Sequence, residues 1–307
     1  MDKSTINSDI INMNITYNLD KPLVISLENN YKENKNSQTY EQTLKNKKWD
    51  YVFIGEGVKW CGFITKINTY FEHLKTLHPE KIVVLTDSRD VFCVREPNNF
   101  IDDINNLTNI NDKIIISSEI FLLGQMDWSD ESIKKELEKD KNYFFQGIPI
   151  KKYWEHYNKL YNIPLRKYVN SGLIIGKVKN LINAFEWMII NKFNDDQLGL
   201  SNYANNFPQL VYLDFDANLL HTSCFGVDGG LYDVKQKFDS PTLAELFGFA
   251  NYFLHIPGIN ISKGQKYMYE YLTELIKNNS FANENHFAKL YDIKIIDKIT
   301  YNYFEKK

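Results

Sequence analysis

Short apolar runs that alternate with stretches of helical periodicity constrain the fold of this 307-residue chain more than any other feature. Such runs cover residues 22–27, 51–55, 82–86 and 113–117, and apolar side chains recur at helical spacing between residues 63 and 74. Continuous apolar runs separated by helices are typical of parallel strands that are covered on both faces. The sequence therefore predicts an α/β fold with a Rossmann-like, mostly parallel central sheet and flanking helices.

The composition of the chain indicates a polar tail, one domain and a C-terminal extension. The first 20 residues are polar and lack the apolar stretch of about 7–15 residues that a signal peptide requires. We expect a tail over residues 1–20, one domain over residues 21–278 and a C-terminal extension over residues 279–307. Residues 29–48, rich in Asn and Lys, predict a solvated connection with room for one helix. No run approaches the roughly 18 apolar residues that span a bilayer, so we expect a soluble protein, cytoplasmic in the producing cell.

The balance of charge argues against nucleic acid as a partner. The chain has 36 basic and 39 acidic residues and a formal net charge of −3. It therefore has no overall electrostatic footprint for nucleic acid, and an anionic ligand has to be held by local groups. The three cysteines are far apart, without the spacing of a zinc site or a disulfide framework.

Two carboxylates follow the apolar run at residues 82–86. Asp87 and Asp90 are three positions apart, so a turn can bring both toward one point, and His255 ends another apolar run. Carboxylate oxygens suit Mg²⁺ or Mn²⁺, and an added imidazole is compatible with Mn²⁺. In open α/β sheets, ligands gather beyond the carboxyl ends of strands. Two alternatives stay open: an Asp that caps a turn beside a solvated partner, and a structural histidine.

Two further polar segments could contribute to a site. Asp195 and Asp196 precede a segment that can start a new helix, where capping is the simpler explanation. Asn170 and Gly172 precede the apolar residues 174–175. The glycine could admit a ligand close to the backbone and the asparagine could donate to a hydroxyl, although a turn alone would also explain them.

Three side chains could bind a nucleotide. Trp60 follows two glycines and could stack on a base, with a buried core position as an equal alternative. Lys66 and Lys263 could neutralise phosphate charge, although the usual place of a lysine is the solvated surface.

Taken in order, these segments resemble the glycosyltransferase domain of the procollagen lysyl hydroxylase and glycosyltransferase enzymes, and the related collagen-type glycosyltransferases of large DNA viruses. The resemblance extends over roughly residues 23–263. Its segments are, in order, Val84-Leu85-Thr86-Asp87-Ser88-Arg89-Asp90-Val91, Ser117-Ser118-Glu119, Asn170-Ser171-Gly172, Asp195-Asp196-Gln197-Leu198 and His255. Each motif alone is weakly specific, and the resemblance rests on finding all five in one order.

The resemblance implies a GT-A type fold and a retaining transfer of a hexose, glucose in particular, from a UDP-sugar to a hydroxyl group. The acceptor would be a glycan or a collagen-like protein that carries hydroxylysine, such as galactosyl-hydroxylysine. A homodimer and a viral source are both compatible with it.

The resemblance also implies roles for individual residues. Asp87, Asp90 and His255 would hold Mn²⁺, with Mg²⁺ as the second choice, and Trp60 would stack on uracil. The other donor-binding positions would be Lys66, Thr86, Ser88, Arg89 and Lys263, together with Asp87. The catalytic residues, on the side of the sugar and acceptor, would be Asn170, Asp195 and Asp196.

The chain departs from the family at three places. Arg89 stands where the family has an aromatic residue, so uracil would lose one stacking partner unless the guanidinium plane replaces it. Residues 122–124 (Leu-Leu-Gly) stand where the family has Cys-Trp-Pro, which removes an aromatic side chain near the acceptor sugar. The acidic run is reduced to residues 195–196, and the loop from His255 to Lys263 is two residues longer than in the family.

Two other functions compete with a glycosyltransferase. One is a sugar- or nucleotide-binding domain without activity, which the loss of the family aromatics would allow. The other is an aspartyl phosphatase with Asp87 as its nucleophile, but that chemistry expects a second carboxylate two residues later, where Arg89 stands. The glycosyltransferase is the leading hypothesis.

Overall fold

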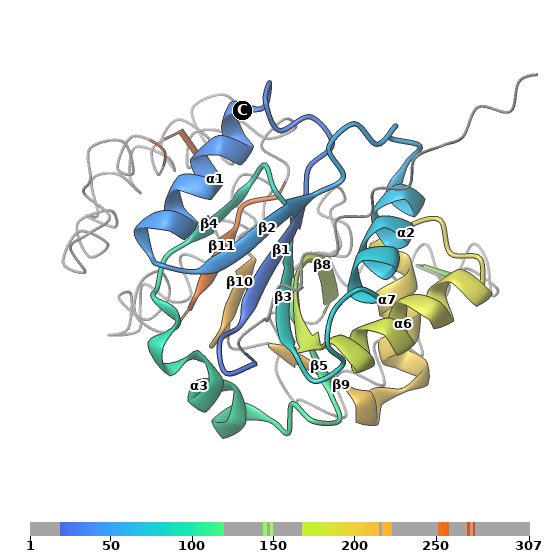
Figure 1. Cartoon of the computed structure of the whole chain (residues 1–307). Coiled ribbons are helices and arrows are strands. Elements are labelled where there is room, and N and C mark those ends of the chain that lie inside the picture. Colours follow the sequence, from blue (N-terminus) through green and yellow to red (C-terminus); the bar gives the residue numbers. More distant parts are fainter. Residues whose placement is uncertain are drawn as a thin grey trace, which may run out of the picture.

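The computed structural model describes residues 19–119, 144–145, 148–149, 168–214, 217–222, 251–257, 269–270 and 273. In these residues the chain forms a mixed α/β fold with helices on both sides of a six-stranded sheet (Figure 1). The predicted α/β fold around a mostly parallel sheet is confirmed, whereas the GT-A type that the resemblance implies stays a prediction. Lys263, residues 122–124 and the expected extension over residues 279–307 lie outside the described residues.

Five of the six strands run in one direction. In spatial order the strands are β2 (Asp50–Ile54), β1 (Leu23–Leu27), β3 (Ile82–Thr86), β8 (Tyr168–Lys177), β5 (Ile114–Glu119) and β9 (Val211–Asp214). β1 is parallel to β2 and β3, and β5 is parallel to β9, whereas β8 is antiparallel to β3 and β5. The carboxyl ends of five strands and the amino end of β8 therefore meet at one edge of the sheet.

A second, three-stranded sheet lies beside the first. It contains β10 (Leu220–Thr222), β11 (Phe253–His255) and β4 (Val91–Cys93), in that spatial order. β11 is antiparallel to β4 and places His255 opposite Val91. A separate antiparallel pair is formed by β6 (Phe144–Phe145) and β7 (Ile148–Pro149).

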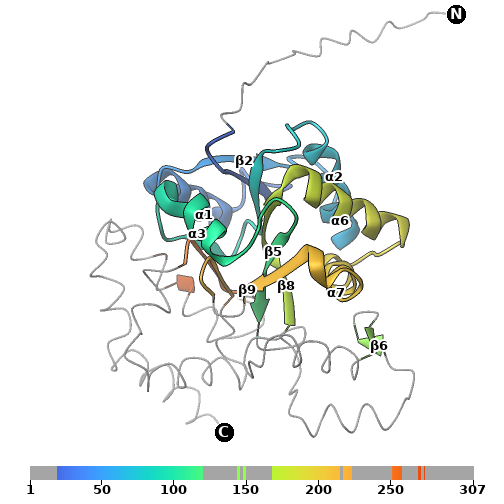
Figure 2. The ribbon, with the colours of Figure 1, turned by 90° about the horizontal axis from the view of Figure 1, so that it is seen from below.

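The described helices cover the main sheet in two groups. They are α1 (Lys35–Asn46), α2 (Phe63–Leu74), α3 (Phe100–Leu107), α6 (Val178–Ile190) and α7 (Asp196–Asn206), with two short 3₁₀ helices, η1 (Pro97–Asn99) and η2 (Pro208–Leu210). The helices α2, α6 and α7 lie together on one side of the sheet, and α1 and α3 lie on the other (Figures 1 and 2). None of these helices is long and apolar enough to cross a membrane.

Alternation along the central strand β3 explains the two layers. Val83 and Leu85 pack into the core that contains residues of α2, α6 and α7. Ile82 and Val84 pack into the core that contains residues of α1, α3 and β4. Since successive side chains of a strand point to opposite faces, a strand that is apolar at every position needs cover on both. The continuous apolar run is thus explained by its place in the middle of the sheet.

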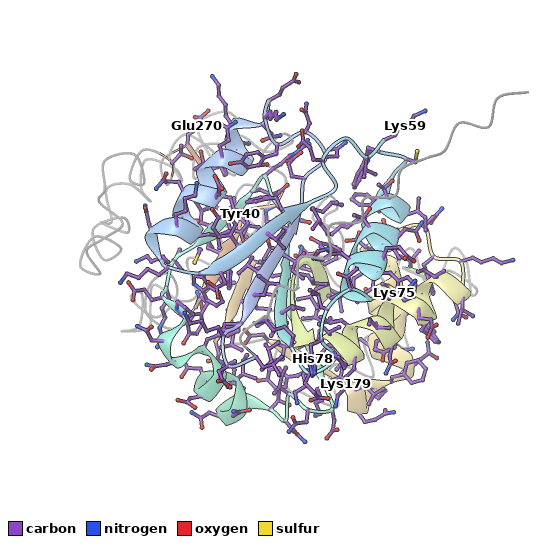
Figure 3. All side chains as sticks on the ribbon, in the orientation of Figure 1. Tyr40, Lys59, Lys75, His78, Lys179 and Glu270 are labelled. Atoms are coloured by element: carbon purple, nitrogen blue, oxygen red, sulfur yellow. The ribbon has the colours of Figure 1, made fainter. Side chains whose placement is uncertain are left out.

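The structure corrects three expectations. Residues 29–48 contain one helix, as the sequence allowed, but they are not simply solvated, because α1 buries Tyr40 (Figure 3) and Leu44 against the second sheet. Asn170 and Gly172 do not precede a strand but lie within β8. Phe63 has the spacing of a core residue of α2, yet its side chain is 50% exposed.

Candidate active site

The polar side chains of the site gather at the edge of the sheet where the parallel strands end. Glu28 follows β1, Asp87 follows β3, Glu119 ends β5 and His255 ends β11. Asn170 reaches the same edge because β8 runs in the opposite direction, so that its first residues extend past the end of β3. Polar side chains of the chain are therefore concentrated at the edge where ligands bind in open α/β sheets.

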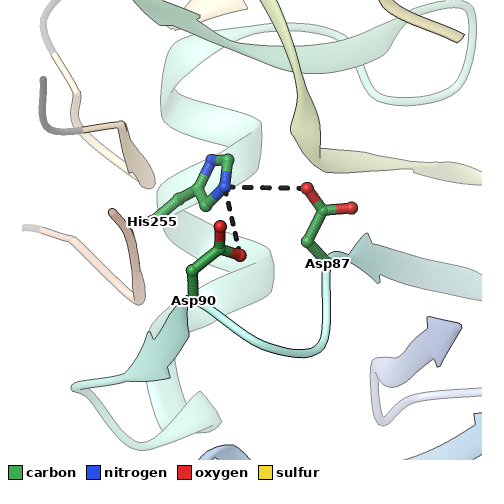
Figure 4. A group of neighbouring side chains, drawn as sticks. All are labelled: Asp87, Asp90 and His255. Atoms are coloured by element: carbon green, nitrogen blue, oxygen red, sulfur yellow. Dashed lines mark ion pairs between the residues drawn. The ribbon is translucent and has the colours of Figure 1, made fainter. Parts of the chain in front are cut away.

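Asp87, Asp90 and His255 form a compact group with the donor set of a metal site (Figure 4). The Nε2 atom of His255 lies 3.6 Å from Asp87 Oδ2 and 3.4 Å from Asp90 Oδ1. One donor atom from each residue lies within 4.8 Å of the others. His255 is 2% exposed, and its Nε2 atom has no hydrogen-bond partner in the described part of the chain. A buried nitrogen that faces two carboxylates without a hydrogen bond fits a divalent cation of the Mn²⁺ or Mg²⁺ class.

Pairing between β4 and β11 brings the histidine to the carboxylates. Asp90 directly precedes β4, and the N–H group of Ile256 donates to the carbonyl oxygen of Asp90 at 2.8 Å. A stretch of only two residues joins Asp87 to Asp90, which holds both carboxylates near the imidazole. A ladder between segments far apart in the sequence thus builds the group.

The electrostatics of His255 reflect its two acidic neighbours. Burial lowers the pKa of the imidazole, but the negative charges of Asp90 and Asp87 outweigh burial and raise it above its ordinary value of 6.5. A metal ion would therefore compete with a proton for this nitrogen.

Gly172 makes room for the imidazole. A Cβ atom at this position would lie 2.2 Å from Cε1 and 2.5 Å from Nδ1 of His255. The sequence indicated a glycine that admits a ligand close to the backbone, and what approaches this backbone is the side chain of His255.

Lys66 lies buried between two carboxylates. Its Nζ atom is 2.6 Å from Asp87 Oδ1 and 2.6 Å from Asp196 Oδ2, and it donates to the carbonyl oxygen of Ser171 at 3.3 Å. Burial lowers the pKa of this lysine, but Asp196 and Asp87 outweigh burial and hold it well above 10.5. The solvated surface considered for Lys66 is wrong, since the residue is 6% exposed. Asp87 thus directs one oxygen to an ammonium group and the other to His255.

The two adjacent acidic residues before α7 have different environments. Asp195 is the N-cap of α7 and accepts a hydrogen bond from the N–H group of Leu198 at 2.7 Å. Burial raises the pKa of Asp195, with a smaller contribution from the charge of Asp196. Asp196 is 3% exposed and its ion pair is with Lys66. The capping considered for this segment is present at Asp195, and a direct role for either residue in catalysis stays a prediction.

Glu28 anchors Arg89 and Ser88 at the floor of the site. Arg89 donates from Nε to Glu28 Oε2 at 2.9 Å and from Nη2 to Oε1 at 2.7 Å, and Ser88 donates to Oε2 at 3.0 Å. Burial raises the pKa of Glu28, but hydrogen bonds from Arg89, Ser37 and the N–H group of Asn30 outweigh it and lower the pKa from 4.5 to about 2. The guanidinium group is therefore held in one plane by a bidentate ion pair.

Replacing Glu28 by glutamine should reduce stability in a pH-dependent way. Because the pKa of Glu28 is lowered in the folded protein, its contribution is fully present above pH 4.5 and is lost as the pH falls toward about 2. The difference in free energy of unfolding between wild type and Glu28→Gln, measured in urea, should therefore be largest at pH 7 and shrink between pH 4.5 and pH 3. Glu72→Gln, which alters an exposed ion pair, is the control. A Glu28→Gln difference that stays constant over this range would contradict the assignment.

A cavity of about 470 Å³ opens beside the acidic group. Its walls combine charged, amide and aromatic side chains: Leu27, Glu28, Asn29, Asn30, Trp60, Phe63, Lys66, Asp87, Ser88, Arg89 and Asp90. Trp60 is 45% exposed and meets Phe63 edge to face at 5.9 Å between ring centroids, so the core position considered for Trp60 is wrong. The cavity thus offers exposed aromatic faces next to cations and carboxylates.

Thr86 lies beneath this cavity instead of in its wall. Its hydroxyl accepts a hydrogen bond from Tyr40 at 2.9 Å, and its carbonyl oxygen accepts from Ser26 at 3.0 Å and from Tyr70 at 2.7 Å. The donor-binding role expected for Thr86 remains a prediction.

Sequence reasoning missed two kinds of residue in the cavity. Glu28 ends an apolar strand just as Asp87 does, so the rule for strand ends would have found it. Asn29 and Asn30 follow it directly. Phe63 gave no such signal, because an apolar residue at helical spacing is expected in the core.

Comparisons with known proteins give a limited result. No protein-family model matches the sequence, and no curated protein matches it. A solved structure, a glycosyltransferase involved in the glycosylation of the major capsid of PBCV-1, is similar to 83% of this chain and 99% of its own chain, with 12% sequence identity and a TM-score of 0.41. The functional argument therefore rests on the geometry of the site.

Proposed function

We propose that the chain is a metal-dependent glycosyltransferase that transfers a hexose, glucose in particular, from a UDP-sugar to a hydroxyl acceptor with retention of configuration. One observation carries the proposal: the unpartnered Nε2 atom of buried His255 faces Asp87 and Asp90 at the edge of a cavity with an exposed tryptophan. A phosphate-bearing ligand with an aromatic base matches this combination of a cation site and a stacking surface.

The residues of the site would have different roles in the transfer reaction. Asp87, Asp90 and His255 hold Mn²⁺, or Mg²⁺, which would neutralise charge on the diphosphate of the departing UDP. Lys66 places a positive charge beside the carboxylate of Asp87, in the wall of the cavity. Trp60 offers its face to uracil, and the hydroxyl group of the acceptor attacks the sugar. Lys263 is proposed only from the resemblance, as is the role of Asn170 at the side of the sugar.

Arg89 takes the place of an aromatic residue of the family and lines the cavity as a fixed guanidinium plane. Such a plane can stack on an aromatic base and donate to phosphate or carbonyl oxygens. We therefore propose that Arg89 contributes to donor binding. Because residue 89 is an arginine, the chain lacks the carboxylate that an aspartyl phosphatase needs two positions after Asp87.

The acceptor is proposed from the sequence resemblance alone and would be a glycan or hydroxylysine on a collagen-like protein. A homodimer and a viral source are proposed on the same basis.

The test measures release of UDP from a panel of UDP-sugars in the presence of Mn²⁺. We expect turnover or hydrolysis with at least one UDP-hexose, lost with EDTA and with Asp90→Asn. Asp90 is the most selective choice, because Asp87 also pairs with Lys66. Asp102→Asn makes the same chemical change on the exposed face of α3 and should retain activity. Binding without turnover of any UDP-sugar would favour a non-catalytic domain, and the absence of both binding and turnover would overturn the proposal.

A further inference from the structure

Asn170 occupies a buried position at the centre of the hydrogen bonds around the metal-binding group. Its Oδ1 atom lies 2.9 Å from His255 Nδ1 and accepts a hydrogen bond from the N–H group of Gly172 at 2.9 Å. Its Nδ2 atom donates to Glu119 Oε2 at 3.2 Å. Asn170 is 4% exposed and Glu119 is 2% exposed. These contacts form a continuous series of hydrogen bonds from β5 through β8 to the imidazole on β11.

Two backbone N–H groups fix the direction of the hydrogen bonds that connect Glu119, Asn170 and His255. The N–H group of Gly172 can only donate, so the atom of Asn170 that faces it must be the oxygen. The N–H group of Ser171 lies 3.3 Å from Gln197 Oε1 and fixes that side chain in the same way, leaving its Nε2 atom to donate to Glu119 Oε1 at 2.9 Å. Glu119 thus accepts from two amide groups, one on each oxygen, which is what an ionised carboxylate requires.

The orientation of Asn170 determines the tautomer of His255. Since Asn170 Oδ1 can only accept, the Nδ1 atom of the imidazole must carry the hydrogen. In the neutral ring the Nε2 atom then presents its lone pair toward Asp87 and Asp90. A histidine that binds a metal through Nε2 needs this tautomer, and a hydrogen bond from the other ring nitrogen is the usual way to fix it.

We propose that Asn170 is the positioning residue that sets the tautomer and the ring orientation of His255 for metal binding, with Glu119 and Gln197 holding Asn170 in place. This inference deepens the proposed function and rests on it, because it assigns Asn170 to the support of the metal ligand. It differs from the role that the sequence resemblance implies, in which Asn170 lines the side of the sugar.

The chain has a matched control for this position. Ser118 is a fully buried neighbour of Glu119 on β5, and its hydroxyl donates to the carbonyl oxygen of Asp214 at 2.8 Å. Ser118→Ala therefore removes one buried hydrogen bond of the same sheet without changing the contacts of Asn170 or His255. A general loss of stability would affect this variant as well.

The experiment has two readouts on the whole chain. Nitrogen-15 NMR of the imidazole groups in the metal-free protein, at a pH high enough that the ring of His255 is neutral and with His255→Gln to assign the signals, reports which ring nitrogen carries the hydrogen. Titration with Mn²⁺ alone, followed by electron paramagnetic resonance of the free ion, reports affinity. We expect hydrogen on Nδ1 in wild type and in Ser118→Ala, loss of this preference in Asn170→Ala, and a dissociation constant for Mn²⁺ that rises about 10–100-fold in Asn170→Ala.

The outcomes separate the two proposals. A neutral wild-type ring with its hydrogen on Nε2, or an Asn170→Ala variant that keeps both the tautomer and the Mn²⁺ affinity, would overturn this inference. Absence of Mn²⁺ binding in the wild type would instead remove the proposed function, while the NMR result still tests the role of Asn170. If Asn170→Ala does not fold, Glu119→Gln replaces it, because a glutamine there must face one of its two amide neighbours with a donor. That variant should weaken Mn²⁺ binding in the same direction.

Discussion

Replacing Gly172 by alanine should abolish Mn²⁺ binding while the sheet around it stays folded. The added Cβ atom would lie within 3 Å of three atoms of the His255 ring, the closest at 2.2 Å. Carbon atoms in contact prefer separations of about 3.5–4.0 Å, so the ring must leave its position beside Asp87 and Asp90. Extra atoms in a packed core cost about 1–3 kcal/mol, which a domain of this size can tolerate.

A double variant shows whether the ring is the cause. In a His255→Ala background the added methyl group meets no imidazole, so Gly172→Ala should cost much less stability there than in the wild type. Gly176→Ala is the control on the same strand: its Cβ atom would lie 3.0 Å from Ile114 and 3.1 Å from Leu181, far from the acidic group. Thermal unfolding and Mn²⁺ titration of the four variants measure both effects. Wild-type Mn²⁺ affinity in Gly172→Ala would contradict the assigned position of His255.

Gly172 also shows which parts of the fold could be predicted from the sequence. β3 has an apolar residue or threonine at every position, and its limits were predicted because this pattern is local. The first residues of β8 contain Asn170, Ser171 and Gly172, which resemble a turn in isolation. They belong to a central strand because partners from β5 and β11 satisfy their polar groups. Those partners are 51 to 85 positions away in the sequence, so no local pattern contains them.

The same limit applies to the site. Asp87, Asp90 and His255 each follow or end an apolar strand, and this property made them candidates as metal ligands. Lys66 has no comparable signal, since its burial depends on Asp87 and Asp196, which only the folded chain brings together. The roles implied by the resemblance named Lys66 and Asp196 separately, but nothing in the sequence indicated that they form one ion pair.

Replacing Lys66 by methionine should destabilise the protein by about 3–5 kcal/mol, because it leaves Asp196 buried without a counter-ion. Asp196→Asn should cost less, since Lys66 keeps its pair with Asp87. The double variant Lys66→Met/Asp196→Asn should recover part of the loss, because no buried charge is left unpaired at α7. Lys75→Met alters an exposed ion pair at the end of α2, the helix that contains Lys66 (Figure 3), and should stay within about 1 kcal/mol of wild type. Urea denaturation at pH 7 measures all four.

Ligand binding by the same variants separates a structural from an electrostatic role of Lys66. The ammonium group shares Asp87 with the proposed cation, so its removal takes away a competing positive charge and should retain or strengthen Mn²⁺ binding. UDP, whose phosphates are attracted by both positive charges, should bind more weakly to Lys66→Met even in the presence of saturating Mn²⁺. Equal losses of Mn²⁺ and UDP binding would indicate that Lys66 only maintains the local fold. Opposite changes would show that the buried lysine competes with the cation for Asp87 and contributes positive charge to the donor site.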